Sequence, residues 1–385
     1  MKRVLLLMVL TIIFIFVEMV NWFCFLLDEI TYPNWRKTSI RKPLFIVGMP
    51  RTASTWLHKT LFSDSGQFTS MKSWEILFAP SIIQKKACNL LGKFDRRFNG
   101  ILSNPIKKLD NFLFRDYKPG HPTSFFDIEE DDIVLIHILS NMFLIFQFPG
   151  SKRLRNLAWF DVRLPEKRKK RIMWFFRVCI QKHLYVYGNG RTYLSKSPCH
   201  TPKIQSLKAT FPDSRFVCTF RHPEQAIPSA LSLFFRYFKI FENHLEIKNV
   251  AEQTLQMADH WYAYPLKIFS DWLSEDYLLL DYNHLVHSPE TTVSEIYHHF
   301  GLTLSDEFRQ KLVAENQKSK TYKSNHIYSV SEFGITEEEI QERYLQLYEQ
   351  YLKSSDESNR KKESVPVSMV ENGQSGRLDR GNRYL

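Results

Sequence analysis

The sequence predicts an α/β fold, with a doubly wound parallel sheet flanked by helices, a helical cap region and an N-terminal hydrophobic helix. Short apolar runs bounded by turn residues recur along the chain, and a helical pattern follows each, which is typical of strands buried on both faces of a parallel sheet. These runs are 44–48, 192–194, 215–220 and 277–281. Residues 75–190 are rich in Phe, Leu and Ile, and we expect them to form helices that cap the sheet. With 44% hydrophobic residues among 385, the chain can bury a large core.

The chain is expected to divide into three parts. Residues 1–42 hold a hydrophobic segment and a basic linker, and residues 43–353 form the α/β domain with its cap. Near the end of that domain, Thr336 and Glu339 have the spacing of a capping box, which predicts the start of a helix. Ser, Asn, Gly, Glu and Lys dominate residues 354–385, so we expect this tail to be disordered.

The hydrophobic segment, residues 4–27, indicates membrane association. A bilayer span needs about 20 apolar residues, and Glu18 and Asn21 are the main interruptions here. A helix that lies in the membrane interface or packs on the domain is the alternative, and no small-residue cleavage site follows the segment. Lys2 and Arg3 precede it, but more basic residues follow it, which favours a cytosolic side for the domain. The following basic residues are Arg36, Lys37, Arg41 and Lys42.

The charge balance predicts an anionic partner. The formal net charge is +11, and basic residues crowd together between 152 and 203. Nucleic acid, an anionic membrane surface and a phosphorylated small molecule all suit such a balance, and charge alone does not choose among them. The five cysteines form no C-x-x-C pair, and no His cluster stands at ligand spacing, which argues against a disulfide scaffold and a structural zinc site.

The segment 48–55 lies between the first predicted strand and a helix, and it predicts a phosphate-binding loop. Such a loop offers backbone N–H groups and the positive end of a helix dipole, and the hydroxyls of Ser54 and Thr55 add donors. The loop is P-loop-like, but Ala53 and Ser54 stand where G-x-x-x-x-G-K-[ST] requires Gly-Lys. The missing lysine removes the main support for triphosphate and magnesium chemistry. The alternative is an ordinary strand-to-helix turn.

Two further clusters lie at the ends of predicted strands. Arg221, in Arg-His-Pro, can grip a phosphate bidentately, and Ser229 follows in the next helix. Lys196 follows another strand, where a lysine can stabilise negative charge on a transferring group, although a surface lysine is the alternative. Glu75 stands beside Trp74 and is a candidate general base, with a helix-surface carboxylate as the alternative. His200, close to Lys196, is the reserve candidate for the base.

Together these clusters resemble the sulfotransferases that use 3′-phosphoadenosine 5′-phosphosulfate (PAPS), in particular the largely bacterial branch related to the tyrosylprotein sulfotransferases. That family typically carries Pro-Arg-Ser-Gly-Thr-Thr after its first strand, and Pro-Arg-Thr-Ala-Ser-Thr stands here at 50–55. The likeness covers roughly residues 42–353. It also includes Trp74-Glu75, 129–131, 195–198, 211–213, Arg221 with Ser229, and 281–302.

The resemblance implies in-line transfer of a sulfuryl group from PAPS, as co-substrate, to a hydroxyl acceptor, with no metal. Arg221 and Ser229 would hold the 3′-phosphate, Glu75 would be the base, and Lys196 with Arg51 would stabilise the transition state. The residues implied at the 5′-phosphosulfate end are Arg51, Thr52, Ala53, Ser54, Thr55 and Trp56. Ala53 replaces the family glycine, and we expect the loop to keep a helical-range φ there, since alanine tolerates positive φ poorly.

Two other classes of protein remain open at this point. A kinase-like phosphotransferase shares the strand–loop–helix unit but requires the missing Walker lysine. A non-catalytic, membrane-attached protein that binds a nucleotide or an anionic lipid also fits the basic surface. No nucleic acid partner is expected. The aromatic-rich stretch 112–174 and the hydrophobic N-terminus favour an apolar or lipid-bound alcohol as acceptor.

Overall fold

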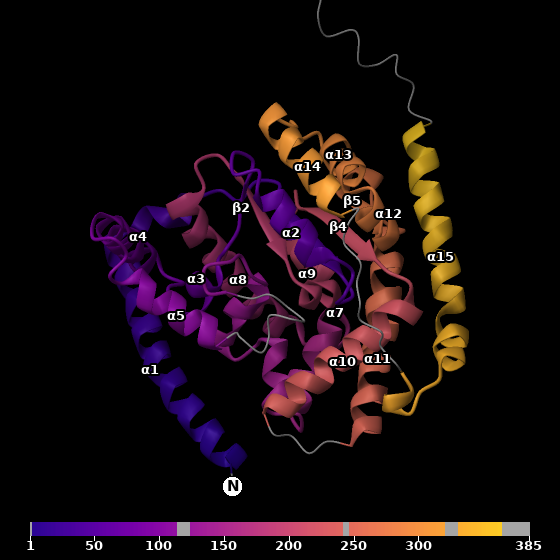
Figure 1. Cartoon of the computed structure of the whole chain (residues 1–385), viewed down its shortest axis with the longest axis horizontal. Coiled ribbons are helices and arrows are strands. Elements are labelled where there is room, and N and C mark those ends of the chain that lie inside the picture. Colours follow the sequence, from indigo (N-terminus) through magenta and orange to yellow (C-terminus); the bar gives the residue numbers. More distant parts are fainter. Residues whose placement is uncertain (1, 114–123, 242–245, 320–329, 364–385) are drawn as a thin grey trace, which may run out of the picture.

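A five-stranded parallel sheet forms the centre of the molecule in the computed structural model, which describes residues 2–113, 124–241, 246–319 and 330–363 (Figure 1). The strand order is β2-β3-β1-β4-β5, and each neighbouring pair is parallel. The strands are β1 (Leu44–Gly48), β2 (Phe68–Thr69), β3 (Thr192–Lys196), β4 (Arg215–Phe220) and β5 (Tyr277–Asp281). The predicted parallel α/β fold is confirmed, whereas β2 was not predicted, because two residues are too few to give a pattern.

Helices cover both faces of this sheet, as a doubly wound fold requires. The described helices are α1 (Lys2–Thr31), α2 (Ser54–Phe62), α3 (Ser73–Leu77), α4 (Ile82–Arg97), α5 (Ser103–Leu113), α6 (Lys152–Arg155), α7 (Phe160–Arg163), α8 (Glu166–Tyr187), α9 (Ile204–Thr210), α10 (Pro223–Ile240), α11 (Ile247–Phe269), α12 (Tyr282–His287), α13 (Pro289–His299), α14 (Asp306–Ser319) and α15 (Glu337–Glu363). Helices α4 to α8 and the end of α3 lie in the predicted cap, residues 75–190, and short 3₁₀ turns connect several of its helices.

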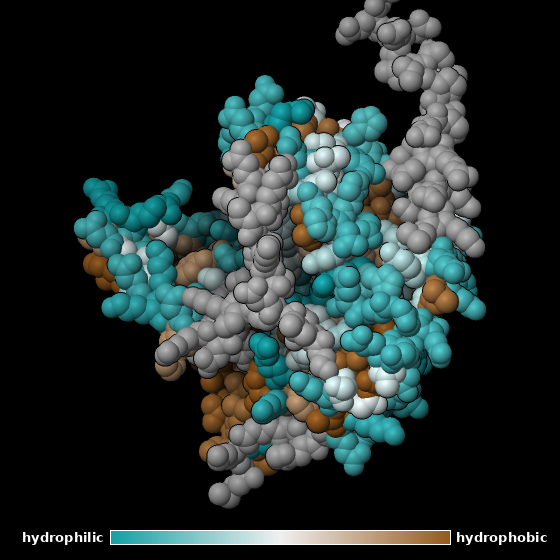
Figure 2. Space-filling model, turned by 45° about the vertical axis from the view of Figure 1, so that its right-hand side comes forward, coloured by the Kyte–Doolittle hydropathy of each residue, from teal (hydrophilic) through white to brown (hydrophobic). Residues whose placement is uncertain are grey.

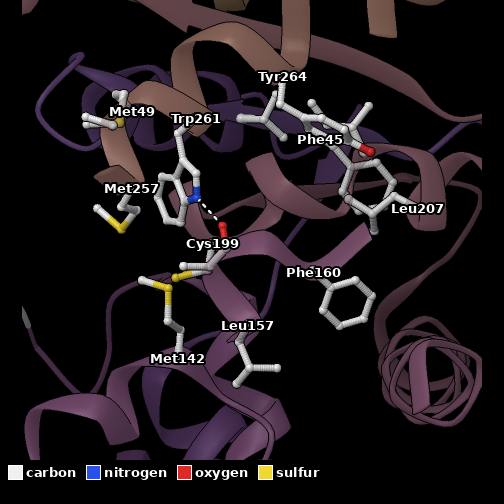
Figure 3. Close-up of a cluster of buried hydrophobic side chains, with 14 of the residues drawn as sticks. Phe45, Met49, Met142, Leu157, Phe160, Cys199, Leu207, Met257, Trp261 and Tyr264 are labelled. Carbon is white, nitrogen blue, oxygen red and sulfur yellow. Dashed lines mark hydrogen bonds between the residues drawn. The ribbon is translucent and has the colours of Figure 1, made fainter. Parts of the chain in front are cut away.

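The alternation of side chains along β1 divides the core into two layers. Leu44 and Ile46 pack with α2, α13 and α14, and Phe45 and Val47 pack on the opposite face with α8, α9 and α11. All five residues of β1 are buried, which explains why the strand reads as an unbroken apolar run. Figure 3 shows part of the second layer, where the Trp261 indole N–H donates to the carbonyl of Ala158 at 2.8 Å.

Helix α1 lies along the outside of the domain and contacts α4 (Figure 1). Its polar side chains face inward: Glu18 Oε1 lies 2.6 Å from His137 Nδ1, and the carboxylate of Asp28 lies 2.8 Å from Lys182 Nζ. Most of its apolar side chains are exposed, and by length and composition α1 can cross a membrane. The brown area at the lower left of Figure 2 lies over this part of the molecule. The N-terminal hydrophobic helix is therefore present and docked on the domain.

The C-terminal helix departs from the expected boundary. The capping box is confirmed, because Thr336 N donates to the Glu339 carboxylate and Glu339 N donates to Thr336 Oγ1. Helix α15 then continues to Glu363, ten residues beyond residue 353, where the α/β domain was expected to end. Residues 364–385 lie outside the described residues.

Candidate active site

The predicted clusters converge because β1, β3 and β4 are parallel neighbours. Their carboxyl ends lie at one edge of the sheet, where Gly48 ends β1, Lys196 ends β3 and Arg221 follows β4. Ligands of open α/β sheets bind at this edge. The sheet therefore brings three clusters that are distant in the sequence together at a single candidate site.

The loop after β1 begins with a glycine that no other residue can replace without rearrangement. Gly48 has φ of 128°, and a Cβ atom there would lie 2.3 Å from the Thr219 carbonyl oxygen on β4. Thr201 Oγ1 accepts a hydrogen bond from Gly48 N at 2.8 Å and donates one to Gly48 O at 2.9 Å. The close approach of β1 to β4 and the Thr201 clamp fix the direction in which the loop leaves the sheet.

Two residues of the loop hold left-handed backbone angles. Arg51 has φ of 70°, and Ala53 has φ of 59° with ψ of 13°. The expectation that Ala53 keeps a helical-range φ was wrong. Between these two residues, the buried Thr52 hydroxyl bonds to the Met49 carbonyl at 2.9 Å and to Thr219 Oγ1 at 2.7 Å. This inward anchoring holds the strained turn in place, at a cost of about 1–2 kcal/mol for a left-handed alanine.

The turn leaves the N-terminus of α2 available to an anion. Among the described residues, no side chain caps this helix, and its N-cap position is Ala53, which has no side-chain acceptor. The first N–H groups of a helix lack intrahelical partners and favour negative charge. Ser54 is buried in the first turn, and Thr55 and Trp56 beside it are partly exposed. This geometry can accept an anion at the start of α2, and the Thr52 side chain points inward to brace the loop.

The arginine and serine predicted for a second anion site meet the first loop. Arg51 Nε donates to Ser229 Oγ on α10 at 2.9 Å, and Arg221 Nη1 donates to the Arg51 carbonyl at 3.0 Å. The Arg221 guanidinium lies 4.1 Å from the ring centroid of Tyr282, which follows β5. Two cationic side chains from β1 and β4 are therefore held beside one helix N-terminus. Tyr282 lies in the stretch 281–302 noted for the family resemblance, but sequence reasoning gave it no role.

Lys196 and His200 lie in a buried network of acidic residues. Lys196 Nζ lies 2.7 Å from Glu130 Oε1, and His200 Nε2 lies 2.9 Å from Asp131 Oδ1. Lys196 is 2% exposed, so the surface-lysine alternative was wrong. Asp131 begins a 3₁₀ turn within the cap, and Glu130 is the residue directly before that turn. The cap therefore orients the polar groups at the end of β3.

Glu75 occupies a separate buried pocket at the start of α3. It is 3% exposed, and its Oε2 accepts a hydrogen bond from Lys72 N at 2.8 Å and lies 3.7 Å from His183 Nδ1. The alternative of a helix-surface carboxylate was therefore wrong. Burial lowers the pKa of His183 well below its ordinary value, which keeps the imidazole neutral beside Glu75.

Tyr193 on β3 contacts the surroundings of both Glu75 and Lys196, and its ring centroid lies 5.7 Å from that of His183. Its hydroxyl donates to Asp131 Oδ2 at 2.9 Å. Burial raises the pKa of Tyr193 well above its usual range, and the negative charges of Asp131 and Glu75 add to that effect. The two groups of polar residues are therefore neighbours around one strand.

The described residues contain no group of three or more His, Cys, Asp or Glu side chains arranged to hold a metal ion. The network residues Glu130 and Asp131 were noted in the sequence without a role, and Thr201 and Thr219 were missed. No local pattern could identify them, because their partners lie on other strands.

A parallel α/β sheet with a strand-to-helix loop and two converging arginines at its carboxyl edge is the arrangement of a group transferase. Residues 43–306 match the model of the sulfotransferase family, and the chain belongs to that family. It is an enzyme that transfers a sulfuryl group. The alternatives of a kinase-like phosphotransferase and of a non-catalytic binding protein are not favoured by this match.

Relatives and solved structures agree with the assignment. The omega-hydroxy-beta-dihydromenaquinone-9 sulfotransferases Stf3 of Mycobacterium bovis and Mycobacterium tuberculosis are each 23% identical over 325 residues, which cover 78% of this chain and 74% of theirs. Sulfotransferase STF1 of Mycobacterium tuberculosis has a TM-score of 0.62 at 22% identity, with 85% of this chain and 83% of that chain covered. Sulfotransferase STF9 of Mycobacterium avium has a TM-score of 0.65 at 17% identity, with 83% and 79% covered. These two structures share the fold.

Proposed function

We propose that the sulfuryl donor is PAPS, held between the loop at 51–56 and the pair Arg221 and Ser229. The single observation that carries this proposal is the contact between the two anion sites, in which Arg51 Nε donates to Ser229 Oγ. A donor with anionic groups at both ends can contact the open N-terminus of α2 with one end and Arg221 with the other. The guanidinium fork suits a phosphate, and the Tyr282 ring beneath it limits its orientation.

Lys196 and Arg51 are proposed to stabilise the charge that develops during transfer. The acceptor oxygen forms a bond to sulfur while the bond from sulfur to the bridging phosphate oxygen breaks, and adenosine 3′,5′-bisphosphate leaves. Negative charge grows on that oxygen, so preoriented donors lower the barrier more than mobile ones. The ion pair with Glu130 supports this role, because it fixes the direction of the Lys196 ammonium before a substrate arrives.

Glu75 is proposed to accept the proton of the incoming hydroxyl. The backbone N–H of Lys72 holds Oε2, and burial lowers the pKa of His183, which makes its imidazole a weak base and favours the carboxylate. His200 remains the reserve candidate, although its Nε2 is already bonded to Asp131. A near-normal rate for Glu75→Gln together with a large loss for His200→Gln would promote His200.

The acceptor is proposed to be an apolar or lipid-bound alcohol presented at a membrane. Stf3 is named for an omega-hydroxylated menaquinone derivative, and here the exposed apolar side chains of α1 offer a lipid surface to the same domain. We propose that residues 4–27 attach the enzyme to the membrane, with the catalytic domain on the cytosolic side as the flanking charges indicate.

Transfer of labelled sulfate from PAPS to long-chain alcohols in vesicles tests the proposal. Arg51→Ala and Arg221→Ala each remove a donor to negative charge and are expected to lower kcat/KM by roughly 100-fold. Glu75→Gln is expected to lower kcat by at least about 100-fold with little change in donor binding. Arg343→Gln on α15 is the matched control, since Arg343 is paired with Asp259 away from the strand ends. Unchanged turnover in all three site variants would refute the assignment.

A further inference from the structure

Helices α4 and α5 of the cap form a pair that exposes an unusual amount of apolar surface. On α4 the apolar residues recur every three or four positions, and on α5 they form a second row. Nine large apolar side chains of the two helices and of the turn between them are each at least 45% exposed. They are Leu90, Leu91, Phe94, Phe98, Ile101, Leu102, Ile106, Leu109 and Phe112. So many exposed apolar side chains on one short segment mark an interaction surface rather than an ordinary protein exterior.

The pair is a built unit rather than a loosely held loop. The carboxylate of Asp95, near the end of α4, accepts hydrogen bonds from Leu102 N at 2.6 Å and Ser103 N at 3.2 Å, which caps α5. Asp110 on α5 accepts from Phe125 N at 2.7 Å, which ties the pair to the rest of the cap. The two acidic residues of the pair are thus buried and used internally.

All exposed charges on this pair are basic. Between residues 82 and 112 the acidic side chains are Asp95 and Asp110, both buried, and the one buried base is Lys85. The exposed basic residues are Lys86, Lys93, Arg96, Arg97, Lys107 and Lys108. A helix with an apolar row beside Lys and Arg residues is typical of a segment that lies in the interface of an anionic membrane.

Helix α4 of the pair is fixed directly to α1. The Asp28 carboxylate of α1 accepts from Ile82 N at 2.8 Å and Ile83 N at 2.9 Å, so it caps the N-terminus of α4. Gln84 on α4 donates to Asn21 Oδ1 at 2.7 Å. Figure 1 shows α1, α4 and α5 side by side on the edge of the molecule opposite α15. An apolar helix and a cationic amphipathic pair are therefore presented together.

We propose that the α4–α5 pair inserts its apolar rows into the headgroup region of an anionic lipid bilayer, as a second membrane contact beside α1. This inference rests on the proposed membrane attachment through residues 4–27 and adds an independent contact to it. Its chemical logic is that Leu and Phe side chains enter the acyl boundary while the six exposed cations face lipid phosphates. The cap that orients Lys196 is then held at the membrane surface.

Cys88 supplies a native reporter for the test. It lies on α4 and is exposed, whereas Cys24, Cys179, Cys199 and Cys218 are buried. The full chain is labelled with a fluorophore on Cys88 and mixed with vesicles of phosphatidylcholine and phosphatidylglycerol, and the quenching of its fluorescence is measured. We expect iodide quenching to fall roughly fivefold on binding, with strong quenching by nitroxides placed near the lipid headgroups. Total cosedimentation with the vesicles reports attachment through α1 separately.

Paired variants decide between the outcomes. Leu90→Glu with Phe94→Glu is expected to restore iodide quenching while the chain still sediments through α1. Leu273→Glu with Leu345→Glu, two exposed leucines outside the pair, is the matched control and should change neither signal. A bound chain whose Cys88 label stays as accessible to iodide as in solution would overturn the proposal and leave the attachment by α1 intact. A chain that does not sediment with the vesicles would overturn both the attachment by α1 and the insertion of the α4–α5 pair. Protection of the label without vesicles, rising with protein concentration, would indicate self-association and also overturn it.

Discussion

Replacing Ala53 by glycine probes the strained loop directly. Ala53 holds φ of 59°, a left-handed angle that costs an L-residue about 1–2 kcal/mol and costs glycine little. Against this gain stands the larger conformational entropy of an unfolded chain with glycine, about 0.5–1 kcal/mol. We therefore expect Ala53→Gly to raise the free energy of unfolding by roughly 0.5–1 kcal/mol, a sign opposite to that of most alanine-to-glycine changes.

Urea unfolding of the variant and of Ala314→Gly measures this difference. Ala314 lies exposed within α14, where the same chemical change should lower the free energy of unfolding by about 0.5–1 kcal/mol. If both variants lost stability alike, the left-handed angle at Ala53 would be refuted, because the loop would then behave as an ordinary helix start.

Binding of adenosine 3′,5′-bisphosphate gives a second reading of the same variant. The strain at Ala53 is present before any ligand binds, and the Thr52 anchor keeps the loop in one shape. Strain that is equal in the free and bound states cancels in the affinity, so Ala53→Gly should change the Kd by less than about threefold. A gain of tenfold or more, seen by calorimetry, would mean that the loop changes conformation on binding.

Two further predictions concern the candidate site, and a third concerns His58, which is buried on α2. Arg221→Lys keeps the charge but loses the fork that lies against Tyr282, so the KM for the donor should rise about tenfold in steady-state assays. Glu130→Gln leaves the Lys196 ammonium buried without its partner and should lower the free energy of unfolding by about 3 kcal/mol, measured in urea. Burial lowers the pKa of His58 from 6.5 to about 3, so the unfolded chain binds more protons between these values, and stability should fall as pH drops below 6.5. The loss of stability due to His58 should reach roughly 2 kcal/mol by about pH 5. It should be absent in His58→Gln, so equal slopes of stability against pH for the wild-type chain and the variant would contradict the prediction.

The strands were predictable because burial on both faces leaves an unbroken apolar run. The runs at 44–48, 215–220 and 277–281 match β1, β4 and β5, and the run at 192–194 extends two polar residues further, since Ser195 and Lys196 bond to carboxylates in the interior. A local sequence pattern indicates which side chains are buried away from solvent. It does not indicate which partner a buried polar side chain contacts.

Only the positively charged residues of the candidate site could be predicted from the sequence. Arg51, Lys196 and Arg221 each follow a predicted strand, and the rule that parallel strands end at one edge brings them together. Their anchors are distant in the chain: Ser229 is 178 residues from Arg51, and Glu130 is 66 residues from Lys196. The backbone angle of Ala53 was misjudged for the same reason, because it is imposed by hydrogen bonds of the neighbouring residue rather than by alanine itself.

For the membrane attachment proposed above, the contacts of α1 favour a helix that lies along the membrane surface over one that crosses it. Crossing requires about 30 Å of helix free of the domain, which is roughly 20 residues at about 1.5 Å each. Here Arg3 donates to the Gln147 carbonyl at one end, Glu18 contacts His137 midway, and Asp28 contacts Lys182 at the other end. The polar residues that interrupt the apolar run are thus its docking face. Withdrawal of α1 into a bilayer would strand the buried Lys182 ammonium, which costs several kcal/mol, so the exposed apolar face can enter lipid only while the domain stays alongside it.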